Sequence, residues 1–174
     1  TDVGMTEIAK LTNLKRFGCR LADVSGEGIK HLAGLKHLTR LELRETSIDD
    51  SSLEIIGNLP ELEYLDISEC RALKGRTLGE LARLTKLTYL ELRELKKVND
   101  DNFAALGTLT NLTELNLEAT RITDESVTTL LKMQKLERLS VAGSQMGDEG
   151  MMQLSQLPAL KWLNLNNSRP KPCW

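Results

Sequence analysis

The chain of 174 residues suits one domain, and it is 40% hydrophobic but only 3% aromatic, so its core must be built from aliphatic side chains. A formal net charge of −2 and a pI of about 5.8 argue against a dedicated nucleic-acid-binding protein, which would carry an excess of basic residues. No apolar run approaches the ~18 residues that a membrane span needs, and no signal peptide leads the chain.

A unit of 24 or 25 residues recurs along almost the whole chain. Each copy opens on leucines spaced L-x-x-L-x-L, or on a close variant, and the openings fall at Leu14, Leu38, Leu62, Leu87, Leu112, Leu136 and Leu160. The alternation of apolar and polar residues in this opening predicts a short strand. We therefore expect seven parallel strands that begin near residues 15, 39, 63, 88, 113, 137 and 161 and lie in one sheet in sequence order.

The second half of each unit changes to helical spacing. Leu53, Ile56 and Leu59, for example, follow one another every three residues, which predicts a short helix that packs inward on one side. Residues that favour the N-cap stand before these helices at Ser25, Asp49, Asn99 and Thr123. An aspartate column follows, with Asp2 aligned to Asp50, Asp100, Asp124 and Asp148. We interpret these carboxylates as local capping groups that favour the positive end of the helix dipole, and not as ligands.

The chain begins within a unit, because residues 1–13 align with the helical half and no strand precedes them. We expect this chain to be cut from a longer protein, since solenoids normally cover their ends with a polar cap. A strand, a crossover helix and a second strand in the same direction build a parallel sheet with right-handed connections. Strands stack ~4.8 Å apart and helices ~10 Å apart, so the stack must curve with its strands inside.

The predicted fold is thus an α/β right-handed solenoid, a horseshoe with a concave parallel sheet and short helices on its convex surface. Its domain spans residues 1–168 with about seven repeats, of which the first is partial, and residues 169–174 form a Pro-containing C-terminal tail.

The repeats resemble the leucine-rich repeat family. The segments IDDSSL (48–53), ITDESV (122–127) and MGDEGM (146–151) are similar to the bacterial and cysteine-containing types, and ECRALKGRTL (69–78) is most similar to the cysteine-containing type. Thr or Ser replaces the common Asn or Cys at Thr46, Thr120, Ser144 and Ser168. The resemblance implies the horseshoe fold and a role in presenting a surface to partner proteins.

The exposed positions of the predicted sheet form columns across its strands, and the central columns combine aromatic and charged residues. Tyr64 and Tyr89 are expected side by side on neighbouring strands, next to a row of carboxylates. The candidate partner-binding residues of this concave face are Tyr64, Tyr89, Asp66, Glu91, Glu42, Arg40, Arg44 and Arg93. A second acidic row consists of Glu45, Glu69 and Glu94. Two other interpretations are a solvated face whose charges pair with one another and an acidic surface that binds a cation.

Repeats three and four each carry one extra residue just after the strand, at 71–73 and 96–98. These insertions are adjacent in the stack and predict a basic edge patch of Arg71, Lys74, Lys96 and Lys97. The alternative is a tolerated variation in loop length.

No pattern of catalytic residues occurs. The two histidines, His31 and His37, align to different sites and are expected on the surface, and Cys19 and Cys70 are expected reduced and buried in the apolar layer. We predict a non-enzymatic protein–protein interaction module without cofactor or metal, whose protein partner carries a basic patch. The alternative is a structural or regulatory repeat region of a larger protein whose activity lies in another domain.

Overall fold

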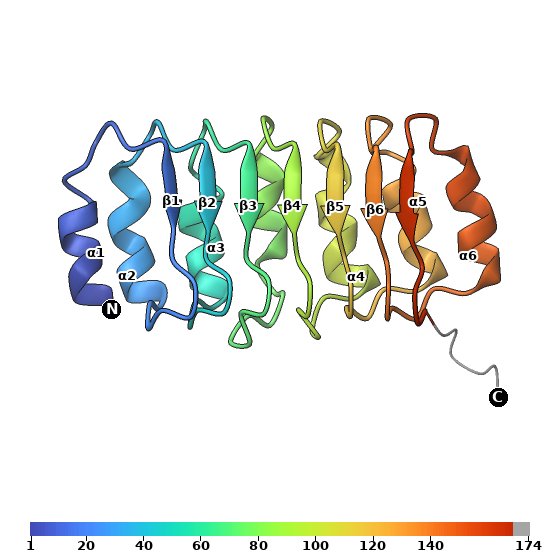
Figure 1. Cartoon of the computed structure of the whole chain (residues 1–174), viewed down its shortest axis with the longest axis horizontal. Helices are drawn as coiled ribbons and strands as arrows, with labels where there is room; N and C mark the ends of the chain where they lie inside the picture. Colours follow the sequence, from blue (N-terminus) through green and yellow to red (C-terminus); the bar gives the residue numbers. More distant parts are fainter. Residues whose placement is uncertain (169–174) are drawn as a thin grey trace.

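Seven parallel strands of three residues each form one open sheet in sequence order (Figure 1). The strands are β1 (Arg16–Gly18), β2 (Arg40–Glu42), β3 (Tyr64–Asp66), β4 (Tyr89–Glu91), β5 (Glu114–Asn116), β6 (Arg138–Ser140) and β7 (Trp162–Asn164). Each begins one residue after the expected position, so the predicted repeat register is confirmed. This computed structural model describes residues 1–168, and the predicted tail at 169–174 lies outside the described residues.

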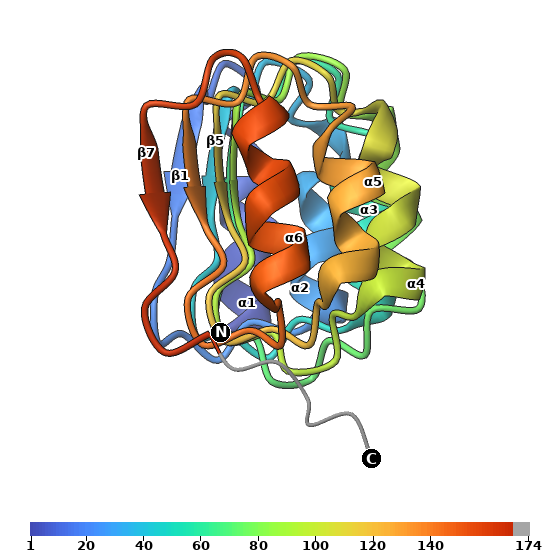
Figure 2. The same ribbon diagram turned by 90° about the vertical axis from the view of Figure 1, so that its right-hand side faces the viewer.

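The helices cover one face of the sheet and leave the other face open (Figure 2). The α-helices are α1 (Asp2–Ile8), α2 (Gly26–Ile29), α3 (Asp50–Ile56), α4 (Asp100–Phe103), α5 (Val127–Leu130) and α6 (Asp148–Gln153). The 3-10 helices are η1 (Lys30–Gly34), η2 (Leu78–Arg83), η3 (Ala104–Thr108), η4 (Asp124–Ser126) and η5 (Leu154–Gln156). In Figure 1 the row of helices extends beyond the row of strands at both ends, as expected when the thicker layer lies outside the curve.

The unit between β3 and β4 has only η2 as its helical segment. Its inserted loop runs through the residues that form the first helical turn in other units. The carboxylate of Asp50 accepts hydrogen bonds from the backbone N–H groups of Lys74 (2.8 Å), Gly75 (3.0 Å) and Arg76 (3.2 Å). Gly75 has a φ of +81°, in the left-handed region where glycine carries no steric penalty. The loop therefore has a fixed shape that is anchored to the preceding repeat.

The predicted N-caps are confirmed, because the side chains of Ser25, Asp49, Asn99 and Thr123 all accept a backbone N–H from the helix that they precede. The prediction that the aspartate column caps its own helices is wrong for Asp2, Asp50, Asp100 and Asp124, whose carboxylates bond to the next repeat. The carboxylate of Asp2 bonds the backbone N–H of Ser25 at 2.8 Å and its hydroxyl at 2.6 Å, which lowers the pKa of Asp2. Asp100 bonds Thr123 in the same way. These four carboxylates thus join the starts of their helical segments to the next repeat.

The core is a ladder of stacked aliphatic side chains between sheet and helices. The central strand leucines Leu41, Leu65 and Leu90 are fully buried, and within residues 1–168 the one large aromatic side chain that is fully buried is Phe103. Cys70 is also buried and has a free thiol. Cys19 is free but only partly buried, contrary to our expectation, because β1 has a strand neighbour on one side only.

Candidate functional site

The open face of the sheet carries a ladder of stacked side chains at its centre. The register pairs Arg40 with Tyr64 and Tyr64 with Tyr89 on successive strands. The two tyrosine rings stack with centroids 4.0 Å apart and an angle of 8° between their planes. The guanidinium carbon of Arg40 lies 3.4 Å from the centroid of the Tyr64 ring. Three rigid strands thus present one continuous surface with a cation at one end and a phenol at the other, which we call the Arg–Tyr ladder.

A row of carboxylates lies beside the Arg–Tyr ladder, one from each of β2, β3 and β4. Glu42 pairs with Arg40 at 2.5 Å, and Asp66 accepts the backbone N–H of Ser68 at 2.9 Å. Glu91 accepts the hydroxyl of Tyr89 at 3.0 Å. Within residues 1–168 neither Asp66 nor Glu91 forms an ion pair. The row therefore contains two carboxylates that form no ion pair within the described residues.

The environment of Glu91 and Tyr89 favours their neutral forms. Burial raises the pKa of the Glu91 carboxyl, and the neighbouring charge of Asp66 raises it further, although the hydrogen bond from Tyr89 opposes this. Burial, the hydrogen bond with Tyr64 and the charge of Glu91 together raise the pKa of Tyr89 far above its usual range. A carboxylate that is half-buried without a counter-ion is costly for the free protein, and such perturbed groups gather at functional sites.

The second acidic row is paired within the protein. Arg20 lies 2.9 Å and Arg44 3.3 Å from Glu45, and Arg44 lies 2.7 Å from Glu69, which also pairs with Arg93. Burial raises the pKa of Glu69, but the pairs with Arg44 and Arg93 outweigh it and lower that pKa overall. Arg44 and Arg93 are thus held by internal ion pairs, and the contribution of Arg20 to this network was missed in the sequence.

The backbone conformation after each strand determines where the second acidic row lies. Each unit turns out of its strand through one residue with a positive φ, and these residues are Leu21, Glu45, Glu69, Glu94, Ala119, Gly143 and Asn167. Ser68 lies two residues after Asp66 at the end of β3, yet it is only 1% exposed and donates its hydroxyl to Asp66 at 2.5 Å. At this position of the repeat Ser68 and Ala142 therefore lie inside the fold, whereas Arg20 remains exposed.

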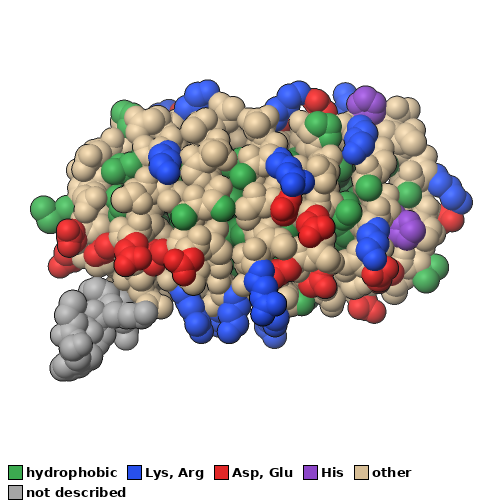
Figure 3. Space-filling view, turned by 180° about the vertical axis from the view of Figure 1, so that it is seen from behind, with side chains coloured by type: hydrophobic (Ala, Val, Ile, Leu, Met, Phe, Trp, Pro, Cys, Tyr) green, Lys and Arg blue, Asp and Glu red, His purple; other side chains and the backbone are tan. Residues whose placement is uncertain are grey.

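The two insertions meet at one edge of the sheet, as the sequence predicts. They enclose a pocket of about 470 Å³ that has Leu73 and Leu95 in its lining and the side chains of Arg71, Lys96 and Lys97 around it. Lys74, the fourth residue of the predicted edge patch, does not line this pocket. Figure 3, which shows the molecule from behind, has Lys and Arg side chains gathered along its lower edge near the middle.

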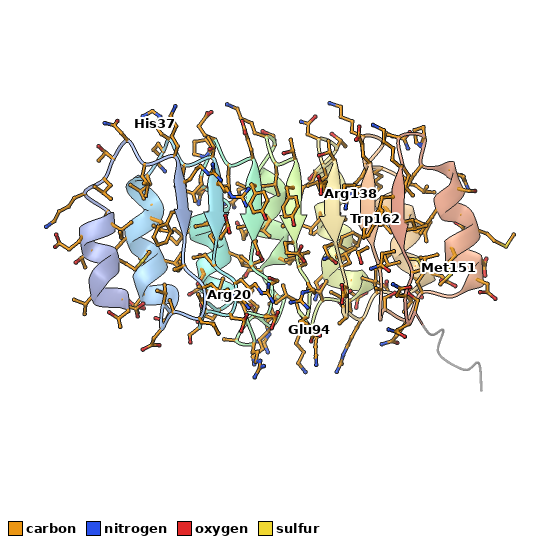
Figure 4. All side chains as sticks on the ribbon, in the orientation of Figure 1. Arg20, His37, Glu94, Arg138, Met151 and Trp162 are labelled. Atoms are coloured by element: carbon orange, nitrogen blue, oxygen red, sulfur yellow. The ribbon has the colours of Figure 1, made fainter. Side chains whose placement is uncertain are left out.

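A smaller pocket lies on the open face, between the Arg–Tyr ladder and the C-terminal strand. Its walls include Tyr89 and Trp162, and its volume is about 110 Å³. The guanidinium carbon of Arg138 lies 4.7 Å from the Trp162 ring centroid, and Arg138 pairs with Glu114 at 3.3 Å. Figure 4 shows Arg138 and Trp162 next to each other over this half of the sheet. The strand register aligns Tyr89, Glu114, Arg138 and Trp162 on successive strands, so the alignment of the repeats is the sequence signal for this pocket.

Other chemistry has little support in the part of the chain that the structure describes. No three or more His, Cys, Asp or Glu side chains in residues 1–168 are arranged to hold a metal ion. His31 and His37 are exposed, as expected. None of the helices in these residues has both the length and the apolar character needed to cross a lipid bilayer.

Comparison with known proteins identifies the repeats. A family model described as a leucine-rich repeat matches residues 108–131 and 132–155, which are two successive units of the stack. The chain is built of leucine-rich repeats. Leucine-rich repeats generally mediate protein–protein interactions and typically act without enzymatic activity. No match was found among curated protein sequences.

Solved structures support the same leucine-rich-repeat fold. An internalin (inlF) of Listeria monocytogenes is 25% identical with a TM-score of 0.72, and the match covers 95% of this chain and 45% of that one. Internalin C2 (inlC2) of the same organism is 24% identical with a TM-score of 0.69, over 95% of this chain and 64% of that one. The plant peptide hormone receptor RGFR1, in complex with RGF2, is 19% identical with a TM-score of 0.57, over 92% of this chain and 29% of that one. The chain thus spans between about half and two thirds of the two internalins.

Proposed function

We propose that the open face of the sheet binds a partner protein, with the Arg–Tyr ladder and the carboxylates Asp66 and Glu91 at the centre of the interface. The observation that carries this proposal is the stacked pair Tyr64 and Tyr89, which is held on rigid central strands and remains partly exposed. Tyrosine and arginine dominate the energetic centres of protein interfaces. Stacking already restricts both rings, so little side-chain entropy is lost when a partner covers them.

The charges beside the ladder favour a partner with a basic patch. Asp66 and Glu91 have no ion pair in residues 1–168, whereas Glu45 and Glu69 are neutralised by arginines. A cation from the partner would compensate the charge that burial makes unfavourable at Glu91. Complementary charge mainly accelerates association, so the on-rate should fall as salt increases.

The test is the double variant Tyr64→Ala with Tyr89→Ala, titrated by calorimetry against a partner first captured from the source cell. We expect the affinity to fall by at least ~2 kcal/mol, which is the loss typical of an interface hot spot. Circular dichroism should remain native, because neither ring belongs to the leucine core.

A suitable control is Arg16→Ala, which lies in the same column but three strands away from Tyr89 on β1. Its affinity should equal that of the unchanged chain. If the double tyrosine variant binds as tightly as the unchanged chain, the centre of the open face is not the binding site. The edge pocket around Arg71, Lys96 and Lys97 then becomes the leading candidate.

A further inference from the structure

The small pocket on the open face is large enough for one side chain. It lies over β5 and β6, with Tyr89 of β4 at one end and Trp162 of β7 at the other. A water molecule occupies roughly 30 Å³ in the liquid, so the volume of about 110 Å³ corresponds to roughly four waters. This volume is suited to a long side chain of a partner and not to a folded element.

Ser140 in the lining of this pocket lacks a hydrogen-bond partner. The sheet register places Ser140 between Asn116 and Asn164, in the same column as the carboxylates. Its side chain is nevertheless only 2% exposed, and its Oγ forms no hydrogen bond with any group of residues 1–168. Buried polar groups in folded proteins almost always have a partner. The unpartnered hydroxyl therefore indicates a polar group that is supplied from outside the chain.

The charge of the pocket indicates that this group is a cation. Glu114 is paired with Arg138, whose guanidinium also lies over the Trp162 ring, so both of these charges are already satisfied. The remaining charged group of the lining is Glu91, which has no ion pair in the described residues. The pocket thus combines one uncompensated carboxylate, one unpartnered hydroxyl and two aromatic side chains.

We propose that this pocket takes one lysine side chain of the partner. Its alkyl stem packs between Tyr89 and Trp162, and its ammonium group donates a hydrogen bond to the Glu91 carboxylate. Ser140 Oγ is covered in the free chain, and it accepts a second hydrogen bond from the ammonium group once the covering side chains rotate aside. An ammonium group is compact and carries three donors, which suits two acceptors in a small space. An arginine fits less well, because its planar guanidinium would compete with Arg138 for the face of Trp162. This inference rests on the proposed function and names the partner side chain that it requires.

The experiment uses N-acetyl-lysine N-methylamide as the probe and follows the amides of the isotope-labelled chain by nuclear magnetic resonance. We expect saturable shifts at Asn116, Ser140 and the Trp162 indole with a Kd of about 1 mM, ordinary for a ligand of this size. The norleucine analogue has the same stem without the ammonium group. It should bind at least about 10-fold more weakly, because it cannot make a charge-assisted hydrogen bond.

Three variants assign the contacts. Glu91→Gln should weaken lysine binding at least about 10-fold, and Ser140→Ala should weaken it about 3- to 10-fold. Glu118→Gln is the control, because Glu118 lies two residues after β5 but does not line this pocket, and it should change the affinity less than about 2-fold. Ser140→Ala should also leave Tm unchanged or raised, because it removes a buried hydroxyl that has no partner.

Several outcomes would overturn the proposal. They are the absence of saturable shifts, equal binding of the norleucine analogue, and a lowered Tm in Ser140→Ala, which would show that ordered water satisfies the hydroxyl. Tyr64→Ala separates this inference from the proposed function, because Tyr64 does not line the pocket. If the lysine probe binds but Tyr64→Ala leaves partner affinity intact, the central interface fails and the pocket stands. If instead the lysine probe does not bind but Tyr64→Ala weakens partner binding, the lysine pocket is ruled out and the central interface stands.

Discussion

Two adjacent aspartates at the start of α4, Asp100 and Asp101, distinguish a helix-dipole effect from a hydrogen bond between repeats. Asp100 accepts hydrogen bonds from the Thr123 backbone N–H (2.8 Å), the Thr123 hydroxyl (2.8 Å) and the Ser126 hydroxyl (2.5 Å). Asp101 stands in the same first turn, is exposed, and forms no hydrogen bond among the described residues. A helix-dipole effect would act on both residues, whereas a bond between repeats belongs to Asp100 alone.

We expect Asp100→Ala to destabilise the chain by about 2–3 kcal/mol. The change leaves one backbone N–H and the hydroxyl of the buried Ser126 unpaired, and each such group costs about 1–3 kcal/mol, less where water can reach it. For a protein of this length the corresponding fall in Tm is about 4–12 °C. Asp101→Ala should cost only the dipole contribution of about 0.3–1 kcal/mol.

Thermal and urea unfolding of the two variants provide the measurement. Equal losses of stability would restore the dipole interpretation and remove the proposed link between repeats. A negligible loss in both variants would show that water replaces these hydrogen bonds without cost.

Three further predictions concern the titratable groups. The pKa of Glu91 in the folded protein is raised above the ordinary 4.5. The contribution of Glu91 to the free energy of unfolding is therefore fully present below that pH and is lost as the pH rises through the folded-state pKa. Glu91→Gln should therefore raise Tm at pH 7, and melts repeated at lower pH should show this gain disappearing near pH 4; a gain independent of pH would contradict the reasoning. The chain has only two tyrosines, so tyrosinate absorbance reports Tyr64 and Tyr89 alone, and both should titrate above pH 10 until the protein unfolds. Alkylation of the native chain, followed by peptide mass spectrometry, should modify Cys19 at least about 10-fold faster than the fully buried Cys70.

The sequence alone determined the repeat, the strands and their order. A unit with one apolar strand and one apolar helix face can bury them only against copies of itself, so the period of the leucines sets both the register and the neighbours of each strand. The columns follow from the same register, which is why the repeat alignment alone places Tyr64 beside Tyr89. The N-caps were also readable, because a residue such as Asn99 bonds its own helix.

The tertiary structure decided the partner of each polar side chain. Asp100 reaches Thr123 in the next repeat, and Glu69 pairs with arginines on both neighbouring sides, although the repeat pattern allows several partners for each. Ser140 belongs to an exposed column by register, yet the surrounding side chains leave it buried and without a partner. The physical reason is that periodicity constrains the backbone, whereas pairing and burial depend on the side-chain conformations of several strands at once.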